Sequence, residues 1–273
     1  WVASKEGVRH MPALQMAGIR QTLGGLAYVL FFLYKGARWP RGREWGVVLM
    51  LAFLNFMLSN GLSTWGVKYI SAGLGSIIGA IFPLWLVVIG LFSHHNKLKP
   101  KTIAGLVAGF IGICVIFYEH LYDFLNPQFR FGIFLSLAAT WSWALGTIYT
   151  KKHAVAFNPY FSLGLQMCIS GLALLVITNL TGLAIPVAQI PAPSWLAIGY
   201  LVVFGSILSF IAYLYALQNL PTEQASLYAY INPIVALAFG WLLFGEIITP
   251  YIITGVLITL LGVYLVNKAA VKI

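Results

Sequence analysis

Polar side chains recur within otherwise apolar segments at intervals of three or four residues, the spacing of one helix face. Two such stripes occur: Asn55, Ser59 and Ser63, and then Ser206, Ser209 and Tyr213. Hydroxyl and amide groups donate and accept hydrogen bonds without ionising, so the chemistry they offer is recognition of a polar solute. We expect the two stripes to line one cavity; hydrogen bonding between packed helices is the alternative.

The segment 221–244 carries the most polar arc. Four of its side chains are expected to line the cavity: Gln224, Tyr228, Tyr230 and Asn232. Pro233 removes a backbone donor, which is tolerated in a membrane where protein or cavity water satisfies the freed carbonyl. Pro83 lies 150 positions earlier, and both prolines are predicted helix breaks or hinges. The alternative is that the tyrosines only pack, with hydroxyls satisfied locally.

Four further residues are candidates for the cavity, each with a plainer alternative. Trp143 and Thr147 share a face of segment 131–150, although tryptophans near segment ends are often interfacial anchors. Ser76 lies in the fourth apolar segment. Lys5 could meet a carboxylate of a solute, or be an ordinary interfacial lysine. For the intramembrane Arg20 we expect either pairing with Glu6 or extension toward the interface.

Catalytic, metal and cofactor sites are not expected. An enzyme would need ionisable or nucleophilic groups clustered at one depth. The histidines all fall in or near loops: His10, His94, His95, His120 and His153. Cys114 and Cys168 lie inside apolar segments without ligand spacing, so we interpret them as small core residues without a disulfide. A membrane enzyme or a scaffold remains as a weaker alternative.

The elements that must position these residues are membrane helices. The chain is 60% hydrophobic and 8% charged, whereas a soluble domain carries about 25% charged residues. Continuously apolar segments near the ~20 residues of a spanning helix recur along the whole length. Ten spans are expected, the first truncated: 1–11, 13–34, 45–67, 71–93, 101–118, 131–150, 159–180, 194–217, 221–244 and 250–267.

The chain also matches itself. At an offset of 150 positions, six of the coinciding pairs are Ser59 with Ser209, Ser76 with Ser226, Pro83 with Pro233, Pro100 with Pro250, Gly105 with Gly255, and Gly112 with Gly262. Residues 1–125 and 126–273 are therefore predicted to be two copies of one five-helix unit. Because five is odd, the second copy must enter the membrane from the opposite side. Inverted repeats of this kind are typical of transporters that alternate access to a central site.

Basic residues predict the orientation. Eleven lie on the side that holds both termini: Lys35, Arg38, Arg41, Arg43, Lys97, Lys99, Lys101, Lys151, Lys152, Lys268 and Lys272. Four lie opposite: Lys5, Arg9, Lys68 and Arg130. The positive-inside rule then puts both termini in the cytoplasm. This distribution accounts for the net charge of +10 without nucleic-acid binding. Gly75-x3-Gly79 and Gly105-x3-Gly109 predict close helix packing within a monomer, or a weak homodimer.

The order of several residues in two copies resembles the EamA-type repeat of the drug/metabolite transporter superfamily. The matching residues are Trp1, Lys5, Pro12, Arg20, Asn232, Pro233, Gly245, Glu246, Pro250, Gly255 and Gly262. The chain departs from the pattern at Asn96, where the first copy usually carries the glutamate seen at Glu246. We interpret Glu246 as a loop and helix-terminus feature. The resemblance implies a ten-helix bundle of inverted repeats with spans one, three, four, six, eight and nine around the cavity.

Together these features predict a secondary transporter in a bacterial inner membrane. The chain is similar to bacterial exporters of aromatic amino acids and other metabolites, so small neutral or zwitterionic metabolites are the expected substrates, with amino acids preferred. Nucleotide-sugar or sugar-phosphate carriage is the alternative, but phosphate needs several cavity cations and only Lys5 and Arg20 are available. No carboxylate lies near mid-membrane, which favours gradient-driven flux over proton coupling.

Overall fold

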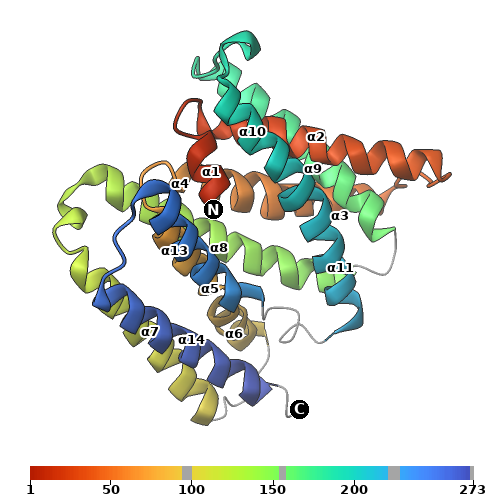
Figure 1. Cartoon of the computed structure of the whole chain (residues 1–273). Coiled ribbons are helices and arrows are strands. Elements are labelled where there is room, and N and C mark those ends of the chain that lie inside the picture. Colours follow the sequence, from red (N-terminus) through yellow and green to blue (C-terminus); the bar gives the residue numbers. More distant parts are fainter. Residues whose placement is uncertain (94–99, 154–157, 221–227, 271–273) are drawn as a thin grey trace.

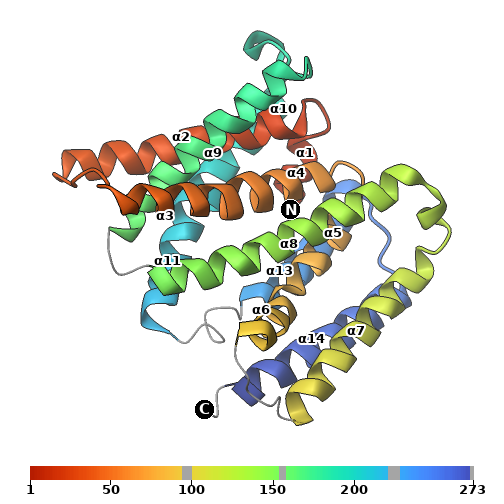
Figure 2. The same ribbon diagram turned by 180° about the vertical axis from the view of Figure 1, so that it is seen from behind.

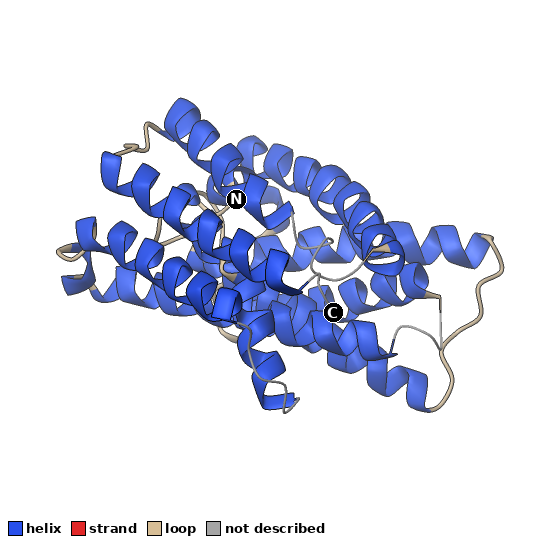
Figure 3. Cartoon of the chain, turned by 90° about the horizontal axis from the view of Figure 1, so that it is seen from below, coloured by secondary structure: helices blue, strands red, loops and turns tan. Residues whose placement is uncertain are grey.

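The computed structural model describes residues 1–93, 100–153, 158–220 and 228–270, and these form helices and loops without a strand (Figures 1 and 3). The elements are α1 (Val2–Gly7), α2 (Ala13–Tyr34), α3 (Arg43–Leu51), η1 (Ala52–Asn60), α4 (Gly61–Gly66), α5 (Ala72–Ala80), α6 (Phe82–Ser93), α7 (Pro100–Glu119), η2 (Asp123–Leu125), α8 (Pro127–His153), α9 (Pro159–Leu180), η3 (Val187–Gln189), α10 (Ala192–Tyr200), η4 (Leu201–Leu208), α11 (Ser209–Asn219), α13 (Tyr228–Phe244) and α14 (Pro250–Ala270).

Six helical stretches among the described residues are long and apolar enough to cross a membrane. They are Ala13–Tyr34, Arg43–Gly66, Pro100–Tyr118, Pro127–His153, Pro159–Leu180 and Ala192–Asn219. Shorter apolar helices cover Ala72–Leu86, Ile231–Phe244 and Pro250–Val266. Large apolar side chains such as Phe110, Phe134 and Leu196 are exposed on these helices, as expected where lipid replaces water. The chain is thus an all-helical, multi-pass membrane protein, while the count of ten spans stays a prediction.

Two antiparallel helix pairs lie at opposite edges of the bundle (Figures 1 and 2). At one edge α7 packs on α14, and at the other α2 packs on α9. Glycines permit both contacts. In the α7–α14 pair, a Cβ added at Gly105 would lie 2.6 Å from the carbonyl oxygen of Gly262, and one added at Gly112 would lie 2.6 Å from that of Gly255. As residue numbers rise along α7 they fall along α14, so the helices run in opposite directions. The glycines of Gly105-x3-Gly109 thus face partners within the chain.

The α2–α9 contact is built in the same way. A Cβ at Gly25 would lie 2.7 Å from the carbonyl oxygen of Gly164, and one at Gly18 would lie 3.0 Å from that of Gly171. In a membrane, where apolar burial gives little driving force between helices, such close backbone approach supplies the packing energy. The two helix pairs therefore have their backbones in direct contact.

Two π-helical segments were not foreseen from the sequence. η1 lies inside the third span and η4 inside the eighth. The two begin 149 positions apart, at Ala52 and Leu201. π-Turns are rare and are frequent at functional sites. Both segments lie in the middle of helices that approach the pocket described below.

Side chains from neighbouring helices and from the same helix bond the carbonyls of both π-segments. In η1, three successive carbonyls accept from side chains: Leu54 from Ser142 at 2.8 Å, Asn55 from Asn60 at 2.9 Å and Phe56 from Gln21 at 3.2 Å. In η4, Tyr28 donates to the Ile207 carbonyl at 2.7 Å, and Ser209 donates to that of Phe204. Inserted side chains of this type are a recognised cause of local departure from α geometry.

The two prolines expected to break helices differ. The fourth span is interrupted between α5, which ends at Ala80, and α6, in which Pro83 is the second residue. By contrast, α13 continues through Pro233, so the expected break there is corrected.

The two cysteines were expected to be buried in the core, and the structure corrects this in part. Cys114 is exposed on α7, and Cys168 is half-buried against Gly25. Both are free thiols.

Candidate functional site

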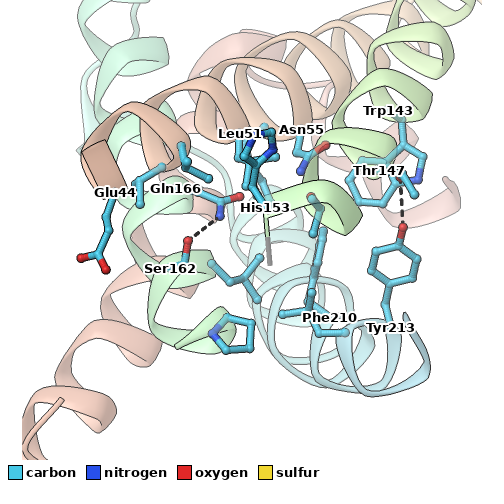
Figure 4. A pocket seen from close by; sticks show the side chains of 17 residues that line it. Glu44, Leu51, Asn55, Trp143, Thr147, His153, Ser162, Gln166, Phe210 and Tyr213 are labelled. Carbon is cyan, nitrogen blue, oxygen red and sulfur yellow. Dashed lines mark hydrogen bonds between the residues drawn. The ribbon is translucent and has the colours of Figure 1, made fainter. Parts of the chain in front are cut away.

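A polar and aromatic pocket of about 60 Å³ lies among α3, η1, α8, α9 and α11 (Figure 4). Its lining includes Glu44 at the start of α3, His153 at the end of α8 and Pro159 at the start of α9. The pocket thus approaches the end of the bundle that carries Lys35, Arg38, Arg41, Lys151 and Lys152, called the basic end below. The distribution of lysine and arginine along the chain predicts that this end is cytoplasmic.

Two buried amides provide its hydrogen-bonding groups. Asn55 is 7% exposed, and its Oδ1 is buried without a hydrogen-bond partner among the described residues. That oxygen lies against Gly146, where an added Cβ would be in collision with it. Gln166 on α9 donates from Nε2 to Ser162 Oγ at 2.9 Å. An unpartnered buried acceptor costs about 1–3 kcal/mol, and the Asn55 side chain that carries it belongs to the lining of the pocket.

Aromatic rings form the opposite wall. The ring of Trp143 on α8 lies 5.4 Å from that of Tyr213 and 6.0 Å from that of Phe210, both on α11. The Tyr213 hydroxyl and the Thr147 hydroxyl lie 3.1 Å apart, as the dashed line in Figure 4 shows. This wall offers flat apolar faces with one hydroxyl pair, which suits a solute with an apolar or aromatic body.

Charge at the pocket is compensated. Arg38 donates to both carboxylate oxygens of Glu44, at 2.7 and 2.8 Å, and the Arg41 backbone N–H adds a third bond at 2.7 Å. The hydrogen bond to Glu44 raises the pKa of Arg38 above its ordinary value. No lysine or arginine lines the described part of the pocket. The site therefore presents no net positive charge to an anion.

The structure brings together four residues singled out from the sequence: Asn55, Trp143, Thr147 and Tyr213. Three serines of the first half lie elsewhere. Ser76 is fully buried and donates to the Gly73 carbonyl at 2.7 Å. Ser59 is buried outside the pocket, and Ser63 is half-buried outside it. Of the stripe expected on span three, only Asn55 lines the pocket.

The stripe expected on span eight is divided as well. Ser206 is buried beneath α2, where its hydroxyl accepts from Arg20 Nε at 3.1 Å. Ser209 is exposed and bonds its own helix backbone. The expected Arg20–Glu6 pair is wrong: Arg20 bonds Ser206 and Asn60, while Glu6 pairs with Arg9 at 3.1 Å.

Lys5 does not reach the pocket. Its Nζ donates to the carbonyls of Val67 at 2.9 Å and Ile70 at 2.6 Å, near the C-terminus of α4. A cation there is favoured by the partial negative charge of the helix end. In this conformation Lys5 therefore joins α1 to the α4–α5 turn instead of contacting a solute, which corrects the expectation of a cavity role.

Asn232 is exposed and lines a second cavity, of about 890 Å³, between α1, α10 and α13. That cavity is mostly apolar and is lined by outward-facing residues such as Leu196 and Phe239. Gln224 lies outside the described residues, as do the side chains of Tyr228 and Tyr230, whose backbones belong to α13.

Ser162, Gln166 and Phe210 are among the pocket residues that were not predicted from the sequence. Ser162 and Gln166 are four residues apart in an otherwise apolar segment, which is the same signal that identified Asn55. Phe210 carried no such signal, because an aromatic residue in an apolar span is indistinguishable from a lipid-facing one.

Comparison with known proteins identifies the family. The sequence profile of the EamA-like transporter family matches residues 1–118 and again 130–268. The chain belongs to the EamA-like transporter family. Within it, the chain is 27% identical to the uncharacterized transporter YvbV of Bacillus subtilis, over 98% of this chain and 86% of that protein. It is 28% identical to the uncharacterized inner membrane transporter YedA of Escherichia coli, over 95% of this chain and 85% of that protein.

A further EamA-like relative carries a more specific name. The probable amino-acid metabolite efflux pump of Escherichia coli is 25% identical, over 97% of this chain and 89% of that protein. One solved crystal structure matches with a TM-score of 0.70 at 14% identity, over 100% of this chain and 95% of that chain. At this identity the likeness concerns the fold alone.

Proposed function

We propose that this EamA-like transporter is a secondary transporter that exports small neutral or zwitterionic metabolites, with amino acids as the preferred class. The observation that carries the proposal is the composition of the pocket. Amides and hydroxyls from Asn55, Gln166 and Thr147 face aromatic rings, and its one carboxylate, Glu44, is neutralised by Arg38. A solute that carries both donors and acceptors, with an apolar body and no net charge, matches these groups.

The pocket argues against phosphate-bearing substrates. Nucleotide sugars and sugar phosphates are bound by arginine or lysine in most protein sites. The described lining has neither, and Lys5 and Arg20 are engaged by backbone carbonyls and neutral side chains. The name of the Escherichia coli efflux pump also favours amino-acid metabolites over phosphates.

Alternating access is part of the proposal. The two halves, 1–125 and 126–273, are inverted repeats that enclose the pocket, with the basic end, where α14 ends, in the cytoplasm of a bacterium. Three observations support this arrangement: the family profile matches twice, α7 and α14 pack antiparallel, and α2 and α9 do the same. The pocket draws Asn55 from the first half and Trp143, Gln166 and Tyr213 from the second.

Flux in proteoliposomes tests the function directly. Purified protein is reconstituted, and counterflow is measured for radiolabelled L-phenylalanine, L-threonine, uridine, glucose and glucose 6-phosphate. We expect amino acids to exchange, glucose 6-phosphate to be excluded, and exchange to proceed without a pH gradient, because the single pocket carboxylate is paired. Exchange of the phosphate, or an absolute need for a pH gradient, contradicts the proposal.

A further inference from the structure

The buried Arg20 is the least expected polar group in the bundle. It lies two turns into α2, is buried, and has no carboxylate partner among the described residues. Its Nη2 donates to Asn60 Oδ1 at 3.1 Å, and its Nε donates to Ser206 Oγ at 3.1 Å. A cation inside a membrane is costly and is commonly functional. The function of Arg20 follows from the positions of its two partners.

Both partners belong to the π-helical segments. Asn60 is the last residue of η1, and Ser206 lies within η4. Arg20 therefore joins the two irregular segments through one rigid, planar guanidinium. The fixed geometry of its donors orders both acceptors together, which a lysine ammonium cannot do.

Asn60 connects Arg20 to the backbone of a pocket residue. While its Oδ1 accepts from Arg20, its Nδ2 donates to the backbone carbonyl of Asn55 at 2.9 Å. The Asn55 side chain is the buried pocket amide whose oxygen lacks a partner. The chain of contacts thus runs from Ser206 through Arg20 and Asn60 to the residue that presents an amide to the cavity.

We infer that Arg20 is a positioning residue: through Asn60 it fixes the η1 backbone at Asn55 and so orients the Asn55 amide for the substrate. The inference rests on the proposed function for its substrate, but its geometry can be tested without transport. It also gives the intramembrane arginine a structural role, because the guanidinium bonds both π-segments at once.

The substitution Asn60→Asp separates the contact of Asn60 with Arg20 from its contact with the Asn55 carbonyl. The carboxylate still accepts from Arg20, and pairs with it more strongly, but it has no N–H for the Asn55 carbonyl. Asn60→Ala removes both contacts, and Arg20→Gln removes the guanidinium. Tyr28→Phe is the matched control, because it deletes a hydrogen bond from α2 to the η4 carbonyls without touching Asn60.

Two readouts are measured on protein that keeps its thermal stability. The first is the rate at which methyl methanethiosulfonate modifies a thiol in Asn55→Cys, with Cys114 and Cys168 changed to serine. The second is the KM and the maximal rate of L-phenylalanine counterflow. In Asn60→Asp we expect modification to slow at least threefold and KM to rise roughly fivefold, with the maximal rate within about twofold. Arg20→Gln should change the modification rate and KM in the same direction. The double variant Arg20→Gln/Asn60→Ala should give the same modification rate and KM as Asn60→Ala alone.

The outcomes are distinguishable. If the wild type fails to exchange L-phenylalanine, the proposed function fails for that solute, and the thiol modification alone decides the inference. Unchanged modification in folded Asn60→Asp overturns it. If Arg20→Gln loses thermal stability and its maximal rate falls at unchanged KM, Arg20 belongs to general packing, which also overturns the inference. An effect of Tyr28→Phe equal to that of Asn60→Asp has the same consequence.

Discussion

The carboxylate of Glu246 caps the N-terminus of α5, accepting from the backbone N–H of Ala72 at 2.7 Å. The second oxygen accepts from Gly73 at 3.0 Å. Glu246 lies in the α13–α14 loop, 174 residues along the chain from Ala72. An anion at a helix N-terminus is stabilised by the exposed N–H groups and the helix dipole. With Lys5 on the preceding carbonyls, this contact fixes both sides of the α4–α5 turn at the end of the bundle opposite the pocket.

Glu246→Ala should therefore lower thermal stability. Loss of two charge-assisted cap bonds costs about 1–2 kcal/mol, which corresponds to a fall of roughly 2–8 °C in Tm for a chain of this size. Melting of the detergent-solubilised protein measures it. The control is Glu6→Ala, which breaks a partly exposed pair with Arg9 and should change Tm little. Equal shifts in both variants would contradict the cap.

Trp143→Ala should impair transport by opening the aromatic wall. Trp143 contacts both Phe210 and Tyr213, so its loss removes the face on which an apolar solute packs. We expect the kcat/KM for L-phenylalanine counterflow to fall roughly tenfold at unchanged membrane abundance. Trp141→Ala on the outer face of the same helix is the control, since Trp141 is exposed. If the two variants behave alike, the pocket is not where the solute binds.

Gln166→Met keeps the length of the side chain and removes its amide. If Gln166 hydrogen-bonds the solute, KM for L-phenylalanine should rise about fivefold, with abundance unaffected. Asn179→Leu removes an exposed amide that bonds only the α9 backbone, so its KM should match the wild type. A normal KM in Gln166→Met would leave Gln166 with only its internal bond to Ser162.

Gly262→Ala should destabilise the α7–α14 pair. A Cβ at Gly262 would lie 2.3 Å from the backbone nitrogen of Gly109, a distance that requires the two helices to separate. Overpacking of this kind costs about 1–3 kcal/mol. Gly199→Ala in α10 meets no atom within 4 Å and should instead leave stability equal or slightly higher. Thermal melting of both variants distinguishes backbone contact from a generic effect of losing glycine.

The spans and several pocket residues could be predicted from the sequence, because membrane helices must satisfy their own backbones and show long apolar runs. Asn55 and Thr147 were identifiable because a polar group in such a run must face protein or a cavity. The partners of Arg20 were not, since they depend on which helices meet at its depth. Ser206 satisfied the same spacing rule as Tyr213, yet it faces α2 rather than the pocket.

The π-segments were unpredictable for a different reason. Nothing in the composition of 52–60 or 201–208 disfavours an ordinary α-helix. Their geometry accompanies donors that come from elsewhere, namely Ser142 on α8 and Gln21 and Tyr28 on α2. Local propensity carries no information about such partners, so the expected polar stripes were placed on α-helical faces that the folded chain does not have.

The π-turns of η1 and η4 hold more residues per turn than an α-helix does. An α-helix advances by about 100° for every residue. If η1 or η4 rewound as α-helix, the part of the helix beyond it would rotate relative to the part before it. Ser63, which follows η1, would then meet different neighbours. Rewinding of this kind would change which side chains the helix presents on a given side.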